Sequence, residues 1–215
     1  MRAAIARRMV ESKTRAPHFY VESEVTMDAV LSAIEATPAD APRLSVTAYL
    51  ARACVVSLGR HPRLNARWKG DLLEPAETVN LGIAVALEDG LIAPALLGAE
   101  QHTLAGTAGA LGDLVARARA SRLKPSELAE GTFTLSNLGA FDVSRFTAII
   151  VPPQVAILAT GATQPRLALE GASVVTVRTL AATVSADHRA VDGADVAAFL
   201  QTFKELLQTP EALDG

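Results

Sequence analysis

The feature that most constrains the fold is a β-branched segment that runs into a histidine and then into an amphipathic helix. Residues 174–184 are rich in valine and threonine, which is typical of a strand. Residues 194–207 place their large apolar side chains on one helical stripe. His188 therefore lies at a strand-to-helix junction, where a rigid support can direct its side chain into a cleft. Asp192 follows four residues later, with a glycine directly after it.

The rest of the chain mixes helices and strands without strict alternation. The patterns predict helices over residues 3–13, 28–36, 45–59, 103–121 and 124–129. They predict strands over residues 18–25, 79–87, 91–97, 132–136, 155–160 and 173–185, with a tight turn at Asp89-Gly90. We find no internal repeat and no long Pro/Ser/Ala-rich linker, so residues 1–215 are expected to form one α/β domain, a sheet with helices packed on it.

Charge is spread unevenly along the chain, although the formal net charge is only −3. The first 15 residues contain five basic residues and one acid, a net of +4, which leaves −7 for the remainder. This basic arm, residues 1–17, could hold a phosphorylated ligand or form the solvated face of a helix, and composition alone favours the solvated face. The small net charge gives no indication of a nucleic-acid partner.

Several kinds of site are not expected. Cys54 is the sole cysteine, so no internal disulfide can form, and its place within a predicted helix indicates a buried thiol. The four histidines lack short metal-ligand spacings, so we expect no metal site. No apolar run reaches the ~20 residues that span a bilayer. The arginine-rich start contains an acid and no cleavage-type segment, so we expect a cytoplasmic protein without a membrane partner.

A second informative segment, residues 131–154, reads as a strand that ends in Ser136 and Asn137 and then enters a glycine turn. Alone, it would be ordinary strand-end chemistry. Together with the string His188-Arg189-x-x-Asp192-Gly193, it resembles the acyltransferase (E2) subunits of 2-oxo acid dehydrogenase complexes. The resemblance also includes four further blocks, in order along the chain: residues 1–20, 44–46, 65–68 and 90–94.

The chain departs from the family pattern in the loop after Ser136. The family usually has Phe-Gly where this chain has Phe141-Asp142. Aspartate adopts a positive φ less readily than glycine, so the conformation of this loop is not implied by the resemblance.

The resemblance implies a two-layer sandwich of a mixed sheet with packed helices, as in chloramphenicol acetyltransferase. It implies transfer of an acyl group between dihydrolipoamide and coenzyme A. The chain most resembles the acetyl-transferring members of the family, so acetyl is the expected group. It assigns His188 as the general base for the incoming thiol and Ser136 as the hydroxyl that stabilises the tetrahedral oxyanion. Arg189 is expected to be structural or electrostatic. The candidates for binding the phosphates of coenzyme A are four basic residues of the arm, namely Arg2, Arg7, Arg8 and Lys13.

Two roles are open for Asp192, which matches the acidic position of the family string. It could be a charge partner that fixes the surroundings of the histidine, or an anchor that starts the next helix. We favour the anchor, paired with an arginine, so that Asp192 would matter for geometry more than for proton transfer.

The resemblance further implies a homotrimer whose catalytic pocket lies between subunits, with the histidine and the serine supplied by neighbouring copies. Family trimers commonly assemble into larger cores through an apolar C-terminal segment, for which this chain offers only Leu213. In the family the lipoyl group is carried on another domain, and the E1 and E3 subunits are partners. Neither a lipoyl domain nor a peripheral-subunit-binding domain is recognised in this chain. Two alternatives stay open: a chloramphenicol-type acetyltransferase, and a non-catalytic scaffold that builds an oligomeric core.

Overall fold

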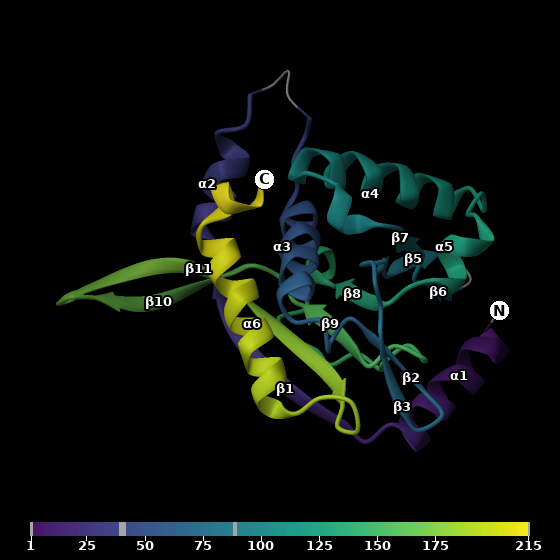
Figure 1. The fold of residues 1–215 in the computed structure, drawn as a ribbon. Helices are drawn as coiled ribbons and strands as arrows, with labels where there is room; N and C mark the ends of the chain where they lie inside the picture. The colour runs from purple at the N-terminus through teal and green to yellow at the C-terminus, as the bar shows by residue number, and fades with distance from the viewer. Residues whose placement is uncertain (1, 39–41, 88–89, 215) are drawn as a thin grey trace.

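The computed structural model describes residues 2–38, 42–87 and 90–214 (Figure 1). The helices are α1 (Arg2–Arg15), α2 (Asp28–Glu35), α3 (Val46–Arg60), α4 (Leu104–Arg119), α5 (Pro125–Ala129) and α6 (Gly193–Gln208), with 3-10 turns η1 (Ala99–Gln101), η2 (Gly139–Phe141) and η3 (Pro210–Leu213). The strands are β1 (His18–Thr26), β2 (Ala66–Lys69), β3 (Leu72–Pro75), β4 (Leu81–Ile83), β5 (Val85–Leu87), β6 (Gly90–Ile92), β7 (Ala95–Leu96), β8 (Phe133–Asn137), β9 (Ala156–Thr160), β10 (Gln164–Glu170) and β11 (Ser173–Asp187).

One mixed sheet organises the molecule. Its strands lie in the order β1-β11-β9-β8-β4-β7, and β10 pairs with the first half of β11. The central strands β4, β8 and β9 are parallel, whereas β1, β11, β10 and β7 pair antiparallel with their neighbours. Two separate hairpins, β2–β3 and β5–β6, lie beside this sheet. In Figure 1 the β10–β11 hairpin extends away from the rest of the domain.

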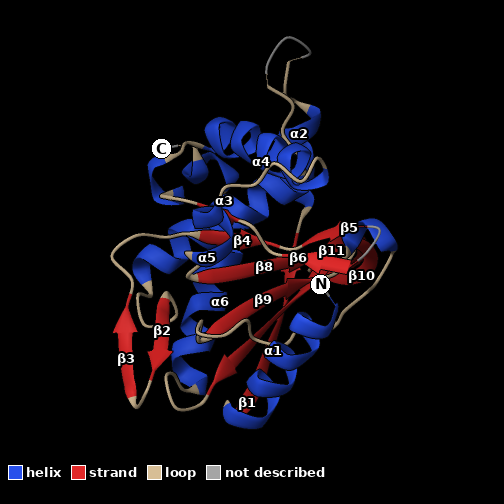
Figure 2. Cartoon of the chain, turned by 90° about the vertical axis from the view of Figure 1, so that its right-hand side faces the viewer, coloured by secondary structure: helices blue, strands red, loops and turns tan. Residues whose placement is uncertain are grey.

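The helices form the second layer. Figures 1 and 2 show α2, α3, α4 and α6 together on one face of the sheet, whereas α1 lies across the opposite face. Alternate residues of the strands, such as Leu158 and Val184, lie in the same buried apolar core as the stripe of α6, and Phe199 and Phe203 on that stripe are fully buried. Hydroxyl N-caps start two of the helices: the Ser45 side chain accepts from Ala48 N at the start of α3, and Thr103 does the same for Gly106 N at α4.

The predicted fold class is confirmed, and the differences are local. The strand predicted over 79–87 breaks after Ile83. Ala84 N still donates to Leu135 O, but the chain then leaves the sheet because β5 pairs with β6. The strand predicted over 91–97 divides into β6 and β7 for the same reason. The turn predicted at Asp89-Gly90 lies in part outside the described residues. The strands β2, β3 and β10 were not predicted.

Two single residues complete the comparison. Cys54 is fully buried in α3, as predicted, and burial raises the pKa of its thiol. Leu213, the apolar candidate for contacts between trimers, is fully buried against its own chain, and its carbonyl accepts from Arg52 Nε at 3.3 Å. In this conformation Leu213 is therefore not presented to another copy. Within the described residues, no helix combines the length and the apolar character needed to span a lipid bilayer.

Candidate active site

His188 is the first residue beyond β11 and lies at the end of the sheet where the N-terminal segment also passes. Its side chain is exposed, and its ring packs on the Phe19 ring with 4.7 Å between centroids. Its backbone N–H donates to Pro17 O at 3.1 Å. The imidazole nitrogens make no hydrogen bond to any described residue. The ring is thus held by packing and by its backbone, and both nitrogens are free for a ligand.

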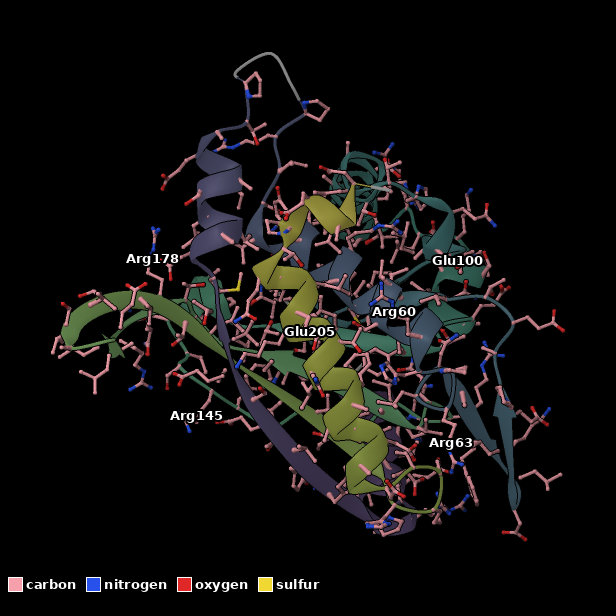
Figure 3. The ribbon with its side chains drawn as sticks, turned by 60° about the vertical axis from the view of Figure 1, so that its left-hand side comes forward. Arg60, Arg63, Glu100, Arg145, Arg178 and Glu205 are labelled. Atoms are coloured by element: carbon pink, nitrogen blue, oxygen red, sulfur yellow. The ribbon has the colours of Figure 1, made fainter. Side chains whose placement is uncertain are left out.

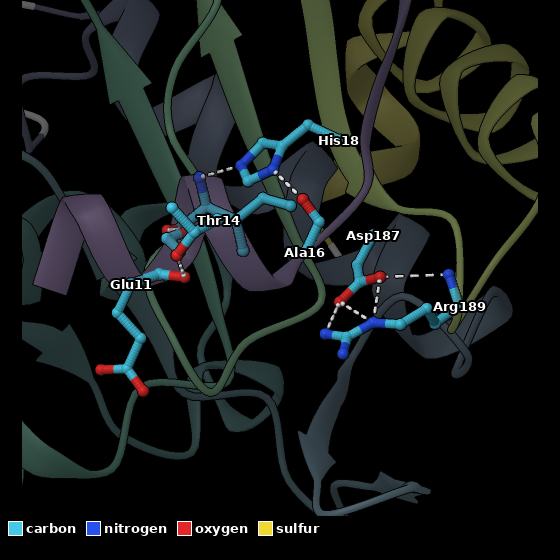
Figure 4. A network of polar contacts seen from close by, with 8 residues as sticks. Glu11, Thr14, Ala16, His18, Asp187 and Arg189 are labelled. Carbon is cyan, nitrogen blue, oxygen red and sulfur yellow. Dashed lines mark hydrogen bonds and ion pairs between the residues drawn. The ribbon is translucent and has the colours of Figure 1, made fainter.

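The two residues that flank His188 bind each other. The Asp187 carboxylate accepts from Arg189 Nε and Nη2, at 3.0 and 2.6 Å, and from the Arg189 backbone N–H at 3.0 Å (Figure 4). The Arg189 guanidinium also lies over the Trp68 ring of β2, 4.7 Å from its centroid. Our sequence interpretation gave Arg189 a structural or electrostatic role and overlooked Asp187. Opposite charges on either side of the histidine were the signal for this pair.

Asp192 is the N-cap of α6. Its Oδ1 accepts from Ala194 N and Asp195 N, at 2.9 and 3.0 Å, and Asp195 Oδ2 accepts in return from Asp192 N at 3.1 Å. These hydrogen bonds, first that from Asp195 N, hold the pKa of Asp192 below its usual value. The helix-anchor geometry that we favoured is therefore present in the chain.

The arginine pairing that we expected for Asp192 is not a direct ion pair within the described residues, although the charge of Arg63 is among the causes that lower the pKa of Asp192, after its backbone hydrogen bonds. Within the described residues the ion pair is made by Asp195, whose Oδ2 lies 3.6 Å from Arg63 Nε. Figure 3 shows Arg63 beside the loop that leads into α6, and its Nη2 also donates to Ala190 O at 2.9 Å. Arg63 thus bridges the turn and the helix, and Asp192 keeps its carboxylate on the backbone of the first helical turn.

Ser136 lies near the end of β8, on the sheet face opposite the helical layer. It is 9% exposed, and its hydroxyl makes no hydrogen bond to any described residue. The register places Ser136 opposite Ala159 of β9, and Ala159 opposite Thr183 of β11. Small and hydroxyl side chains therefore surround Ser136 on this face, and its Oγ is free to donate to a ligand.

The structure does not bring Ser136 and His188 together within one chain. Thr183, which shares the row of Ser136, precedes His188 by five residues along β11. With about 3.3 Å per residue and about 4.8 Å between strands, the two Cα atoms are about 16 Å apart along the strands and about 10 Å across them. A straight line between them is about 19 Å, which no hydrogen bond and no single acyl group can bridge.

The loop that follows Ser136 is fixed at several points. Asp142 adopts the left-handed conformation with φ 56°, so the loop accepts aspartate where the family usually has glycine. Further on, a Cβ at Gly161 would lie 2.1 Å from the Ser144 carbonyl oxygen, so only glycine allows this approach. His18 Nε2 accepts from Ile150 N at 3.2 Å, which leaves the proton on Nδ1 for Ala16 O at 2.9 Å (Figure 4).

The basic arm forms α1 and binds the same loop. Arg8 Nη2 donates to Pro152 O at 2.8 Å, and Ser12 Oγ donates to Ile150 O at 2.7 Å. Lys13 donates to the Tyr20 hydroxyl and lies over its ring. Arg2 and Arg7 are exposed, and neither is ion-paired to a described residue. Within one chain, two of the four coenzyme A candidates are thus occupied and two are free.

No metal site emerges from the geometry of the described residues. In residues 2–38, 42–87 and 90–214, no group of three or more histidine, cysteine or acidic side chains is placed to hold a metal ion. His18, His61 and His188 each contact different elements.

The chain shares its fold with a solved acetyltransferase structure. A chloramphenicol acetyltransferase structure superposes with a TM-score of 0.59 and 14% identity, covering 94% of both chains, which shows a shared fold. At the level of sequence, the family model for 2-oxoacid dehydrogenases acyltransferase (catalytic domain) matches residues 1–214. The chain belongs to this family.

Curated relatives agree with this assignment. The chain is 38% identical to the mitochondrial dihydrolipoyllysine-residue acetyltransferase component of pyruvate dehydrogenase complex from Caenorhabditis elegans, over 99% of this chain and 44% of that protein. It is 38% identical to the corresponding component from Zymomonas mobilis, over 98% of this chain and 49% of that protein. The chain therefore spans about half the length of these relatives. Because relatives include mitochondrial as well as bacterial proteins, the cytoplasmic location stays a prediction.

Solved structures show the same architecture. A probable dihydrolipoamide acetyltransferase from Listeria monocytogenes superposes with a TM-score of 0.92 and 28% identity, covering 97% of this chain and 91% of that one. The dihydrolipoamide acetyltransferase of Azotobacter vinelandii gives a TM-score of 0.93 and 27% identity, covering 98% and 89%. The cubic core of a pyruvate dehydrogenase multienzyme complex gives 0.93 and 26%, over 98% and 89%.

Proposed function

We propose that this chain transfers an acetyl group between dihydrolipoamide and coenzyme A, in a pocket that a second copy completes. The observation that carries the proposal is the pair of unpartnered groups, the exposed imidazole of His188 and the free hydroxyl of Ser136, at opposite ends of the sheet. The names of the relatives, dihydrolipoyllysine-residue acetyltransferase components, support acetyl as the acyl group.

The spacing of the proposed residues supports their assignment. The structural and enzymatic work on the Azotobacter vinelandii enzyme concerned a serine, a histidine 52 positions later and an asparagine four positions after that histidine. In this chain Ser136 and His188 are also 52 positions apart, and Asp192 stands four positions after His188. An aspartate in place of the asparagine favours a role that both side chains can fill, and both are good helix N-caps.

In the proposed reaction His188 takes the proton from the thiol of coenzyme A. A free thiol has a pKa of about 8.5 and is mostly protonated at neutral pH, so a positioned neutral imidazole raises the thiolate fraction during attack. The thiolate attacks the carbonyl carbon of the acetyl-dihydrolipoamide thioester, and the carbonyl electrons move to oxygen. Collapse of the tetrahedral intermediate breaks the bond to the dihydrolipoamide sulfur, which receives the proton from the imidazolium.

Ser136 would act on the intermediate rather than on the proton. Its Oγ–H, donated from the end of a central strand, would bind the oxyanion of the neighbouring copy's reaction. Removing one such donor typically costs about 10²–10³-fold in kcat. The low exposure of Ser136 in a single chain favours this assignment, because a donor shielded from water gives a stronger electrostatic interaction.

The separation of Ser136 from His188 supports an assembly of several copies. We propose a homotrimer, which other copies extend into a larger core, with E1 and E3 as partners through segments outside this chain. The unpaired Arg2 and Arg7 are the stronger of the four arm candidates for the coenzyme A phosphates. Arg8 and Lys13 would first have to leave Pro152 and Tyr20.

The test is an acetyl-transfer assay with acetyl-CoA and dihydrolipoamide on the purified chain and on His188→Ala and Ser136→Ala. We expect transfer by the wild-type chain, a loss of several orders of magnitude in His188→Ala, and a loss of about 10²–10³-fold in Ser136→Ala. Undiminished transfer in His188→Ala would show that His188 is not the general base. Acetylation of chloramphenicol without transfer to dihydrolipoamide would replace the proposed acceptor, and an oligomer without any transfer would indicate a scaffold.

A further inference from the structure

The imidazole of His188 has no side-chain hydrogen bond to orient it within the described residues. Its position therefore depends on the backbone of residues 187–189 and on the Phe19 ring. A misplacement of about 1 Å at a reacting group can cost about 10²-fold in rate. The contacts that fix this short turn are therefore relevant to the proposed reaction.

Asp187 and Arg189 fix the turn from both sides of the histidine. The Asp187 side chain is only 3% exposed, and it accepts hydrogen bonds from three donors of Arg189, namely the backbone N–H, Nε and Nη2. The ring of covalent and hydrogen bonds so formed passes through the backbone of His188. Asp187 O also accepts from Ala190 N and Val191 N, at 2.9 and 3.2 Å, which continues the turn.

Trp68 stacks on the arginine of this ion pair. The planar guanidinium of Arg189 lies over the Trp68 indole, and Trp68 N donates to Pro153 O at 2.8 Å. Arg189 therefore joins the end of β11 to the β2–β3 hairpin, and through it to the loop that follows Ser136. A lysine could keep the charge at this position but could not supply the two-pronged contact or the planar stacking.

On the basis of the proposed function, we propose that Asp187 and Arg189 are positioning residues: their ion pair, stacked on Trp68, holds the His188 backbone so that the imidazole meets the coenzyme A thiol. Neither side chain needs to touch the substrate for this role. The alternative is an ordinary ion pair that only stabilises the strand end, and the same strand offers a matched case of that kind.

The matched control is Arg178, which lies within β11, nine residues before Asp187. Arg178 Nε lies 2.9 Å from Asp28 Oδ1, and its backbone N–H also donates to that carboxylate, as in the Asp187–Arg189 pair. The two arginines are similarly exposed, at 42% and 35%, but Asp28 is 38% exposed and Asp187 only 3%. The control is therefore matched in the arginine and its hydrogen bonds, and the double variant Asp187→Asn/Arg189→Gln removes the difference that comes from the buried charge of Asp187. Figure 3 shows Arg178 near α2 and the base of the β10–β11 hairpin, remote from Arg63 and the turn before α6.

The experiment compares acetyl transfer by the wild-type chain, Arg189→Lys, Arg189→Gln and Arg178→Gln, with kcat and KM determined separately for both substrates. We expect kcat to fall about 10–100-fold in both Arg189 variants, with each KM within about twofold of wild type. Arg178→Gln should keep kcat within about twofold. If Arg189→Gln does not fold, Arg189→Lys and the double variant Asp187→Asn/Arg189→Gln, which leaves no buried charge unpaired, provide the same comparison.

Three kinetic results would overturn the proposal. Recovery of wild-type kcat in Arg189→Lys would mean that charge alone suffices. A raised KM for coenzyme A at unchanged kcat would make Arg189 a substrate contact. Equal kcat losses in Arg189→Gln and Arg178→Gln would leave only a stabilising role.

A second readout separates this proposal from the proposed function. The Cε1–H NMR signal of His188, assigned by its absence in His188→Ala, should shift or broaden in Arg189→Lys and stay unchanged in Arg178→Gln. If the wild-type chain transfers no acetyl group, the proposed function fails while this signal still tests the positioning. An unchanged His188 signal in both Arg189 variants would overturn the positioning itself.

Discussion

Ser136 and His188 face opposite ends of the sheet within one chain, because β8 runs parallel to β9 and β9 runs antiparallel to β11. Both residues lie near the C-terminal ends of their strands. Because β8 and β11 run in opposite directions, these two strand ends lie at opposite ends of the sheet. No side-chain rearrangement can close a gap of about 19 Å. A site that uses both residues must therefore combine the His188 end of one copy with the Ser136 end of another.

Mixing two inactive variants tests this geometry directly. Co-expression of His188→Ala and Ser136→Ala chains should restore activity, because some interfaces will then join an intact His188 to an intact Ser136. With equal, random mixing in a cyclic trimer, about a quarter of the interfaces carry both intact residues, so we expect about a quarter of wild-type activity. Mixing the separately purified proteins without subunit exchange is the control. Activity that stays at the level of the single variants after co-expression would place both groups in one chain.

The close approach at Gly161 supplies a second prediction. An added Cβ would meet the Ser144 carbonyl oxygen at 2.1 Å, and backbone cannot yield as a flexible side chain can. We expect Gly161→Ala to displace residues 143–145 and to lower acetyl transfer by at least about tenfold, together with the thermal midpoint. Gly109→Ala is the matched control: Gly109 lies within α4 with no atom near its added Cβ, so that variant should gain about 0.5–1 kcal/mol of stability. Full activity in Gly161→Ala would show that the loop is not required.

The sequence predicts the elements whose burial pattern is regular and leaves out those without one. Strand β1 was predicted because its alternate residues face the core. In contrast, β2 and β3 form a hairpin with few buried positions, joined at Gly70 with φ 62°, so no periodic apolar pattern marked them. Strand β10 has a proline at its second position and exposes Leu167 and Leu169, at 79% and 77%. Its sequence therefore resembles that of a loop.

The candidate site shows a similar division. The string around His188 and the strand end at Ser136 could be recognised from residue types, since their chemistry is local. Their separation could not, because it depends on the order and direction of strands that are far apart in sequence. The Asp187–Arg189 contact is local and could have been inferred, whereas its contact with Trp68 requires the unpredicted strand β2.

His61 provides a prediction on pH. Burial, and then the charge of Arg60, lower the pKa of His61, while Asp195 opposes this shift, and His61 Nε2 is 2.8 Å from Thr202 Oγ1. Because the folded pKa lies below the unfolded value of about 6.5, the folded chain binds the proton more weakly. This contribution to stability is complete above about pH 6.5 and is lost as the pH falls through the folded value.

Urea unfolding at fixed protein concentration, from pH 8 to pH 5, measures this effect. The wild-type chain should lose more stability on acidification than His61→Gln, which cannot take up the proton. Parallel curves for wild type and His61→Gln would exclude a contribution from His61.

Asp192 allows the two roles considered for it to be separated. As an N-cap it accepts from Ala194 N and Asp195 N, and asparagine can accept in the same way while carrying no charge. If the anchor is its main role, Asp192→Asn should keep the thermal midpoint and kcat close to wild type. Asp192→Ala should lower the midpoint by about 2–4 °C, because α6 loses the hydrogen bonds of its first turn. If Asp192 were instead a charge partner of His188, Asp192→Asn would still keep the thermal midpoint. It would, however, lose kcat as strongly as Asp192→Ala. Thermal unfolding and the acetyl-transfer assay on both variants decide between these roles.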